Sequence, residues 1–301
     1  MLFARWLVAL CFLVPVIGRA EGVALTFDDL PLNGQLASGQ TYTGVTRDVL
    51  AIFKKQGIPP VYGFVNSGKL EGSRDGAEAL RAWVEGGQHV GSHTYSHPDL
   101  TRLTFEDFAQ NIRQNEPALQ LLDKTEAWRW FRYPYLHEGD TLKKRHQVRA
   151  ALKERGYRVA QVTLDYEDYL WNFAYAKCAG KLDAKSTEWL RTSYLKTAAA
   201  YLDADREMAK RVFGREINHV ILLHLGAYSS TILPDLFALL KQKGFTVVTL
   251  EEAQKDAAYA TDPDFASKNG GTLLEQWMDA RKIKYPDVQP KPTKELEALC
   301  Q

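Results

Sequence analysis

The sequence predicts an α/β fold built on a mostly parallel sheet, and three observations support this prediction. Short apolar runs alternate with stretches of helical periodicity along most of the chain. Several runs are continuously apolar, as strands are when both faces of a parallel sheet are covered. The first run is followed by Asp28 and Asp29 and not by a glycine-rich phosphate-binding loop. The pattern fits a closed (β/α) barrel or an open doubly wound sheet.

Seven apolar runs have the length and composition of β-strands. In sequence order they cover residues 23–27, 61–65, 89–92, 128–133, 158–164, 220–225 and 246–250. Chemically reactive side chains follow the first, third, fourth and sixth runs. In a parallel barrel these strand ends meet at one face, where such barrels place their active sites. The sequence therefore favours the barrel over the open sheet.

The stretches between the runs have helical spacing and recognisable helix ends. Helices are predicted over residues 46–56, 77–85, 104–122, 140–155 and 232–243. Glycine follows most of them, as expected at a helix C-terminus. Thr104, with Glu106 and Asp107 behind it, is typical of a helix N-terminus.

Two segments interrupt the alternation of strands and helices. Residues 172–218 form a long insertion, in which 186–213 has helical spacing. That helix either packs on the barrel or forms a wall of a substrate cleft. Residues 259–301 are polar and are predicted to lie over the domain as a C-terminal tail. We therefore predict a barrel over residues 21–258, which carries the insertion and is followed by the tail.

Composition and the N-terminal segment indicate which partners and which cellular compartment to expect. The protein has 301 residues and a formal net charge of +1, which gives no indication of a nucleic-acid partner. Residues 1–20 have the layout of a signal peptide, with an apolar run too short to span a bilayer comfortably. We expect an exported protein, periplasmic or secreted, without stable membrane insertion after cleavage. Cys178 and Cys300 then either pair or stay free, because sequence does not fix their distance.

The first reactive elements have the residue types of a metal site. Asp28 and Asp29 are adjacent, so their side chains point in different directions and can have different roles. His93 and His97 are four residues apart, and both imidazoles can face one ion that Asp29 also binds. Zinc accepts such ligation and keeps a position open for water, from which Asp28 can take a proton. Each element alone also fits an ordinary turn, a core histidine or a surface histidine.

The later elements provide groups for charge and proton transfer. Arg132 can pair with a catalytic carboxylate and hold it ionised. Pro134 stiffens the following loop, so that Tyr135 can present its backbone N–H to a developing oxyanion. His224 ends the sixth run and is a candidate general acid. Either Asp165 or Asp168, from the loop after the fifth run, can orient it.

Together these elements resemble the five motifs of the polysaccharide deacetylases, the NodB-homology enzymes of carbohydrate esterase family four. The matching segments are 26–29, 93–97, 132–135, 165–169 and 222–224. The resemblance implies a distorted (β/α) barrel of about seven parallel strands and one divalent metal ion, usually zinc. It implies these roles: Asp28 as base, Asp29, His93 and His97 as metal ligands, Arg132 as the tether of Asp28, Tyr135 as oxyanion donor, and His224 as acid tuned by Asp168.

The resemblance implies removal of N-acetyl groups from a glycan such as peptidoglycan or a chitin-like polymer. Leu30 stands where the family usually has glycine, and Tyr169 stands where tryptophan is common, so the substrate is less defined than the chemistry. The alternatives are an O-acetyl esterase, a hydrolase of non-sugar amides or imides, and a non-catalytic glycan-binding protein. Exposed aromatic side chains, Tyr135 and Trp171 among them, are candidates for stacking on sugar rings.

Overall fold

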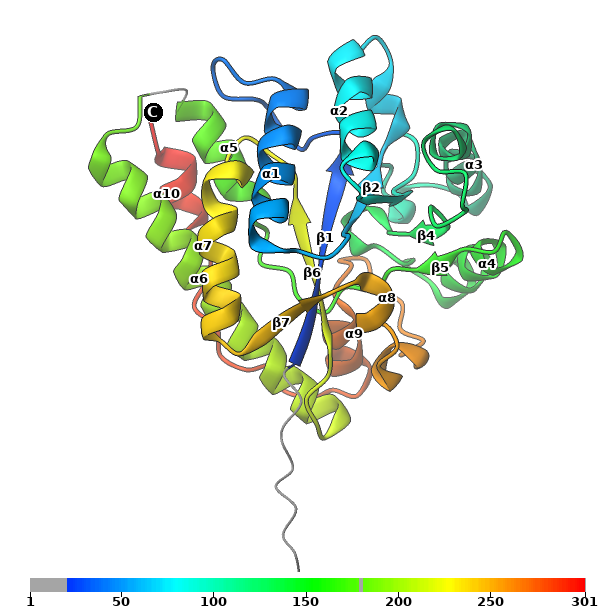
Figure 1. The fold of residues 1–301 in the computed structure, drawn as a ribbon. Helices are drawn as coiled ribbons and strands as arrows, with labels where there is room; N and C mark the ends of the chain where they lie inside the picture. Colours follow the sequence, from blue (N-terminus) through cyan, green and yellow to red (C-terminus); the bar gives the residue numbers. More distant parts are fainter. Residues whose placement is uncertain (1–20, 179–180, 301) are drawn as a thin grey trace, which may run out of the picture.

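The computed structural model describes residues 21–178 and 181–300, so the predicted signal peptide lies outside the described residues. Helices surround a central sheet, whose β1 runs through the middle of the molecule (Figure 1). The strands are β1 Glu21–Leu30, β2 Tyr62–Val65, β3 His89–Ser92, β4 Trp130–Phe131, β5 Arg158–Val159, β6 His219–His224 and β7 Phe245–Val248. The α-helices are α1 Tyr42–Gln56, α2 Arg74–Glu85, α3 Phe105–Leu122, α4 Leu142–Glu154, α5 Tyr169–Cys178, α6 Ala184–Phe213, α7 Ser229–Gln242, α8 Leu250–Ala253, α9 Leu273–Ala280 and α10 Thr293–Ala298.

The sheet is parallel and has the order β5-β4-β3-β2-β1-β6. β6 lies along one side of β1 and sets Asp28 opposite His224. On the other side, β7 pairs with the beginning of β1 and β2 pairs with its end. This arrangement brings the carboxyl ends of β1, β2, β3 and β6 to one face of the molecule.

The segment beyond β5 closes the sheet into a distorted barrel. Leu164 forms a parallel bridge with Ile221 of β6. The N–H of Leu222 donates to the Leu164 carbonyl at 2.9 Å, and the N–H of Thr163 donates to the Val220 carbonyl at 3.0 Å. The predicted barrel is therefore confirmed, but the predicted strand 158–164 is a two-residue strand and a separate bridge.

The core lies between β1 and the helices that follow it. β1 is buried over almost its whole length, because it lies inside the sheet and is covered by helices. Phe27 of β1 packs against Phe53 of α1 and Trp83 of α2, with ring centroids 5.8 Å apart in both pairs. These contacts hold the end of β1, where Asp28 follows Phe27 directly.

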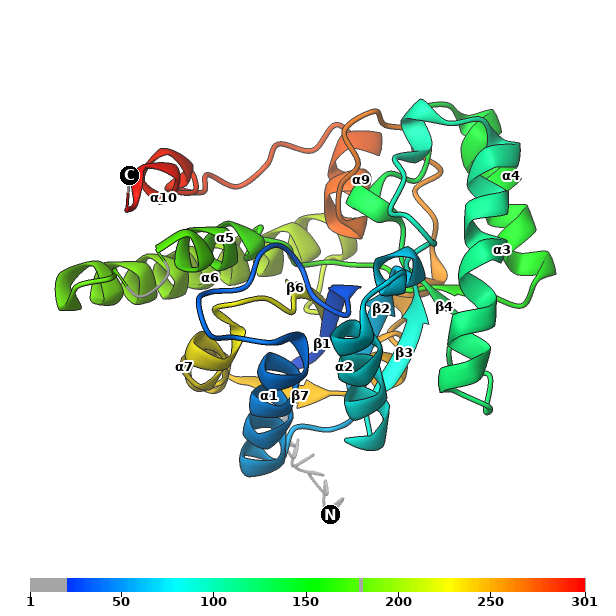
Figure 2. The same ribbon diagram turned by 90° about the horizontal axis from the view of Figure 1, so that it is seen from above.

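The long insertion and the C-terminal segment pack together on one side of the barrel. α6 has 30 residues and covers that side, with α5 beside it (Figure 2). α5 was not predicted as a helix, and it begins before the expected insertion. We name residues 281–300, which follow α9, the C-terminal strap. A disulfide joins Cys178 at the end of α5 to Cys300 at the end of this strap, with 5.3 Å between their Cα atoms.

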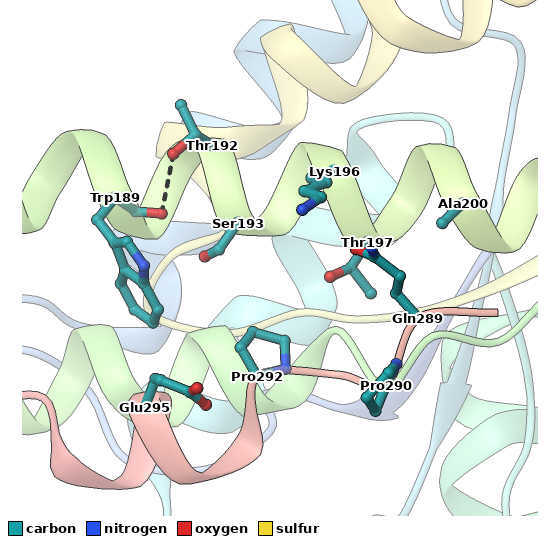
Figure 3. Close-up of a pocket in the computed structure, with 10 residues that line it drawn as sticks. All are labelled: Trp189, Thr192, Ser193, Lys196, Thr197, Ala200, Gln289, Pro290, Pro292 and Glu295. Atoms are coloured by element: carbon teal, nitrogen blue, oxygen red, sulfur yellow. Dashed lines mark hydrogen bonds between the residues drawn. The ribbon is translucent and has the colours of Figure 1, made fainter.

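The C-terminal strap lies alongside α6 (Figure 3). Gln289, Pro290 and Pro292 line one side of a cavity of about 350 Å³, and α6 lines the other. Over the described ranges, every helix is too short or too polar to cross a membrane.

Candidate metal and catalytic site

The predicted reactive side chains meet in a cavity of about 430 Å³ at the carboxyl ends of the strands. Asp28, Asp29, His93, His97, Tyr135 and His224 all line it. Arg132 is buried beneath it, and Asp168 contacts His224. Other lining residues are Asn33, Leu136, Asp165, Glu167, Tyr169, Phe173 and Leu222. The fold thus collects residues from segments that are far apart in the sequence.

Asp29 is held in one orientation by two residues that sequence reasoning missed. The Asn33 side-chain amide donates to Asp29 Oδ2 at 2.6 Å. Lys69 Nζ donates to the Asp29 carbonyl at 3.0 Å and lies 3.4 Å from Oδ1. Asp29 also has a positive φ of 68°, and an oxygen of each aspartate lies near His93 Nε2, at 3.7 Å for Asp28 and 3.8 Å for Asp29. The only hint of this role in the sequence was the position of Asn33, four residues after Asp29.

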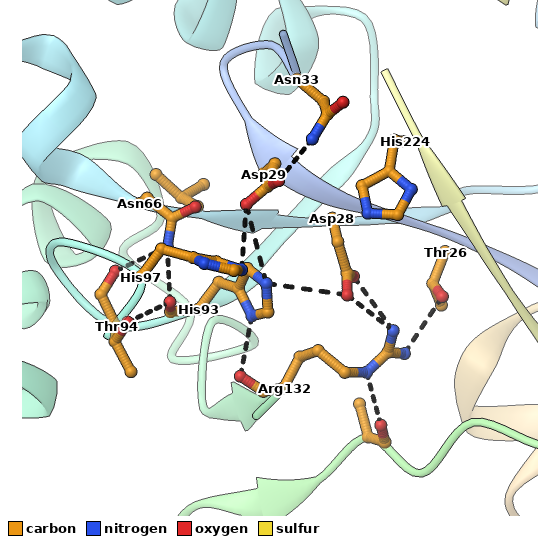
Figure 4. Close-up of polar contacts among 12 residues, drawn as sticks. Thr26, Asp28, Asp29, Asn33, Asn66, His93, Thr94, His97, Arg132 and His224 are labelled. Carbon is orange, nitrogen blue, oxygen red and sulfur yellow. Dashed lines mark hydrogen bonds and ion pairs between the residues drawn. The ribbon is translucent and has the colours of Figure 1, made fainter. Parts of the chain in front are cut away.

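The second carboxylate oxygen of Asp29 faces two imidazoles. Asp29 Oδ1 lies 3.4 Å from His97 Nε2 and 3.8 Å from His93 Nε2 (Figure 4). This oxygen is buried and accepts no hydrogen bond from the described residues. The Lys69 ammonium at 3.4 Å offsets its charge but makes no hydrogen bond to it, so this oxygen can still bind a cation. Asp29, His93 and His97 therefore form a group that could hold a metal ion.

The His93 imidazole is oriented to offer a lone pair at Nε2, and both imidazoles are held in the neutral form. His93 Nδ1 lies 2.8 Å from the Arg132 carbonyl, which can only accept, so the His93 proton sits on Nδ1. Burial lowers the pKa of His93 to about 3 and of His97 to about 4, despite the opposing charge of Asp29. Neutral imidazole is the form that binds metal ions, so the donor set fits a divalent cation.

Asp28 belongs to a second set of contacts, on the opposite side from Asn33. Arg132 Nη1 donates to both Asp28 oxygens, at 3.0 and 3.2 Å. The guanidinium is itself fixed, since Nε donates to the Ala160 carbonyl at 2.7 Å and Nη2 to Thr26 Oγ1 at 3.1 Å. Burial raises the pKa of Asp28 above its ordinary value, although the charge of Arg132 opposes this effect. A raised pKa suits a carboxylate that must accept a proton.

His224 is paired with Asp168, one of the two aspartates considered from the sequence. Asp168 Oδ1 lies 2.7 Å from His224 Nδ1, and Asp168 Oδ2 accepts the His224 backbone N–H at 2.9 Å. Burial lowers the pKa of His224, but Asp168 outweighs it and raises that pKa to about 9. His224 is then protonated at neutral pH and can donate a proton. Asp165 instead accepts the Glu167 N–H at 2.8 Å.

The aromatic residues divide between the cavity and the core. Tyr135 is exposed and adopts a left-handed conformation with φ 58°, and its ring lies 4.5 Å from that of His97. Phe173 of α5 is also exposed and lines the cavity, which the sequence did not indicate. Trp171 is fully buried, so the expectation that it stacks on a sugar is wrong.

Comparisons with known proteins show what this chain is similar to. Residues 17–160 match the model of the polysaccharide deacetylase family. A chitin deacetylase of Colletotrichum lindemuthianum is 26% identical over 245 residues, which are 78% of this chain and 80% of that protein. A chitin deacetylase of Arthroderma benhamiae is 30% identical over 147 residues, which are 49% of this chain and only 35% of that protein.

Solved structures give the same result for the fold. The structure of the Colletotrichum lindemuthianum enzyme has a TM-score of 0.53 at 25% identity, covering 77% of this chain and 86% of that one. A mutant of a CE4 family pseudoenzyme with restored activity has a TM-score of 0.51 at 18% identity, covering 78% and 68%. The second likeness supports the distorted barrel fold alone.

Proposed function

Because this protein belongs to the polysaccharide deacetylase family, we propose that it is a hydrolase that removes N-acetyl groups from a glycan. One observation carries the proposal. Asp29 Oδ1, which accepts no hydrogen bond from the described residues, faces two neutral imidazoles, and the Asp28–Arg132 and Asp168–His224 pairs lie around the same cavity. A metal-binding group, a candidate base and a candidate acid would therefore share one cavity.

We propose zinc as the ion that Asp29, His93 and His97 hold. Two imidazoles and one carboxylate are a common set of ligands for catalytic zinc, which keeps a position open. The bound ion would supply a Lewis acid that polarises the acetyl carbonyl and lowers the pKa of water. The Nδ1–H of His93 donates to the Arg132 carbonyl, and this fixes the ring that presents Nε2.

The protein's own residues then account for the proton transfers. Asp28, aimed by Arg132, accepts a proton from the water that adds to the acetamide carbon. The Tyr135 N–H is the proposed donor to the carbonyl oxygen as negative charge develops. His224 donates its proton to the nitrogen as the carbon–nitrogen bond breaks. Acetate and a free amine are the products.

The acid pair is what favours an N-acetyl over an O-acetyl substrate. An amine is a poor leaving group unless it is protonated, whereas an alkoxide of an ester departs more easily. Asp168 keeps His224 protonated at neutral pH, which matches the greater demand of amide cleavage. Exposed Tyr135 and Phe173 provide aromatic surfaces at the cavity for a sugar ring. We propose peptidoglycan or a chitin-like polymer as the substrate class.

The predicted signal peptide supports a site of action outside the cytoplasm, which we include in the proposal. N-terminal sequencing of the protein purified from culture medium or periplasm would show the new end after Ala20. An intact N-terminus in cell extract would argue against export.

Acetate release tests the proposed activity. The purified protein with added zinc is incubated with chitooligosaccharides, peptidoglycan and acetylated xylan, and Asp28→Asn is the control. Asp28-dependent release from an N-acetyl glycan is expected. Release from xylan alone would make the protein an esterase. Small imides, followed by loss of ultraviolet absorbance, test for an amide or imide hydrolase.

A further inference from the structure

We propose that Lys291 of the C-terminal strap is a positioning residue for the Asp168–His224 pair, acting through its ion pair with Glu167. The inference rests on the proposed function. It assigns a role to a part of the molecule that lies far in sequence from every predicted motif.

The turn that carries Asp168 is held in an unfavourable backbone conformation. Glu167 has a φ of 57°, a left-handed value that is unfavourable for a residue with a side chain. Local bonds support the turn, since Asp165 Oδ1 accepts the Glu167 N–H and the Leu170 N–H donates to the Glu167 carbonyl at 3.0 Å. Asp168 follows directly and accepts two bonds from His224. A shift of the Glu167 backbone would therefore move the partner of His224.

Lys291 holds this turn from outside. Its Nζ lies 3.0 Å from Glu167 Oε2, and the ammonium also sits 5.0 Å from the centre of the Tyr201 ring on α6. The Lys291 side chain is 18% exposed and that of Glu167 is 40% exposed, so water and salt screen this ion pair from the Glu167 side. It links the Asp168 turn to α6 through a single side chain.

The backbone of the strap at Lys291 has little conformational freedom. Pro290 and Pro292 flank it, and proline fixes its own φ and favours an extended conformation in the residue before it. Both prolines lie against α6 at the cavity shown in Figure 3. Less conformational entropy is then lost when the lysine pairs with Glu167.

The strap is anchored on both sides of Lys291. Before it, Arg211 of α6 donates to the Lys284 carbonyl at 2.6 Å. After it, Leu296 is buried in the core, and Lys177 Nζ of α5 donates to the Glu297 carbonyl at 2.7 Å. The Cys178–Cys300 bond then joins the strap to α5, the helix that begins immediately after the Asp168 turn.

Lys291 also offsets negative charge behind the catalytic pair. Its charge acts on Asp165 and on Asp205, a buried carboxyl of α6. Without the ammonium, Glu167 would lose its ion-pair partner, and the Asp168 turn would lose the contact that holds it to the strap. The loss of Lys291 should therefore act on the Asp168–His224 geometry and not on metal binding.

Three variants test the proposal by acetate release. Lys291→Met keeps the length of the side chain and removes its charge, Lys291→Arg keeps the charge, and Lys294→Met removes the charge of an exposed lysine of the same strap. We expect Lys291→Met to lower kcat about tenfold, with KM within about twofold, because a small misplacement near the chemistry is costly. Lys291→Arg should recover most of this loss, and Lys294→Met should match the unmodified protein.

A second measurement does not depend on turnover. Nitrogen-15 NMR of labelled histidines, assigned with His224→Gln, reports the His224 Nδ1–H bonded to Asp168. Its downfield proton signal should broaden or move in Lys291→Met and persist in Lys294→Met. If the unmodified protein releases no acetate, the proposed function fails, and this signal alone decides the role of Lys291. An unchanged kcat, an equal loss in Lys291→Arg, or an undisturbed His224 signal in Lys291→Met would overturn the inference.

Discussion

The charged cluster at the cavity and the one around Glu138, both among the described residues, differ in how their carboxylates are satisfied. In the first, at the cavity, Asp29 Oδ1 has no hydrogen-bond donor among the described residues. In the second, Glu138 accepts from Arg149 through Oε2 and from Gln161 and Gln276 through Oε1. Both clusters carry a desolvation penalty, but Asp29 Oδ1 has only an ion pair with Lys69 at 3.4 Å to offset it, whereas both Glu138 oxygens accept hydrogen bonds. The comparison indicates that one cluster stabilises the fold and the other is built for a ligand.

The Glu138 cluster joins segments that the barrel alone would leave apart. Arg145 and Arg149 come from α4, Gln276 comes from α9, and Asp262 lies between the last strand and α9. Arg145 is fully buried and contacts Glu138, Asp262 and Gln276. This cluster therefore attaches the segment after β7 to the body of the domain.

The largest expected difference between the clusters is in activity. Asp28→Asn should lower kcat by about 10²–10⁴-fold, because the base is lost while the shape is kept. Glu138→Gln should leave kcat within about twofold, since Glu138 is not among the residues that line the cavity. Acetate release by both variants, with circular dichroism to show that they fold, is the measurement. A comparable loss of kcat in Glu138→Gln would remove the distinction.

For the free energy of unfolding, we expect the Glu138 cluster to matter more than the cluster at the cavity. Burial raises the pKa of Glu138, but Arg149 and Arg145 outweigh it and hold the pKa below its ordinary value of 4.5. Such a group stabilises the fold above the unfolded pKa, and this contribution is lost as the pH falls through the folded pKa. Glu138→Gln should therefore lower the free energy of unfolding by about 3 kcal/mol at pH 7.

Urea unfolding at several pH values checks this expectation. The difference between the unmodified protein and Glu138→Gln should shrink as the pH is lowered below about 4.5. A difference that stays constant down to about pH 3 would show that packing, and not the charge of Glu138, is responsible.

Metal binding should sharpen the comparison further. Zinc at about one hundred times its dissociation constant should raise the free energy of unfolding by about 2.7 kcal/mol, because it binds only the folded state. His97→Ala should abolish this gain, and Glu138→Gln should retain it. Thermal melts with and without a chelator, together with metal analysis of the purified protein, measure both. Zinc stabilisation that survives in His97→Ala would place the ion elsewhere.

The smallest expected effect is on the pH profile. Asp168 raises the pKa of His224 to about 9, so activity that needs protonated His224 should fall at alkaline pH. Asp168→Asn removes the charge that raises this pKa, and the alkaline limb of kcat should move toward acid by about one unit, worth about 1.4 kcal/mol. Steady-state rates from about pH 6 to 10 are the test. An alkaline limb that stays in place would mean that another group sets it.

Much of the site was predictable from sequence because its residues stand at strand ends. Asp28 and His224 were inferred from separate apolar runs, and the register of β1 and β6 places them opposite one another. Pairing of parallel strands makes such convergence a general consequence of the fold. The barrel was predicted for the same reason, although its closure depends on the single Leu164–Ile221 bridge that the described residues form.

The parts that sequence did not predict depend on tertiary contacts. Lys69 lies near Asp29 because η1, Ser67–Leu70, follows β2, and a lysine in a loop gives no signal of such a role. The pairing of Cys178 with Cys300 could not be decided from sequence, because it depends on the path of the strap over α5. α5 itself is apolar on most sides and is poorly amphipathic, so periodicity did not reveal it.

The disulfide also changes the topology of the molecule. Cys178 and Cys300 are 122 residues apart, so their bond closes a covalent ring that contains α6, β6, α7 and β7. A protease that cuts once within this ring opens it without releasing a fragment. The part that carries His224 would stay attached through the sulfur atoms, and the nicked protein would run as two pieces on a gel only after reduction. The disulfide therefore keeps the two pieces covalently joined after a single cut in the chain between Cys178 and Cys300.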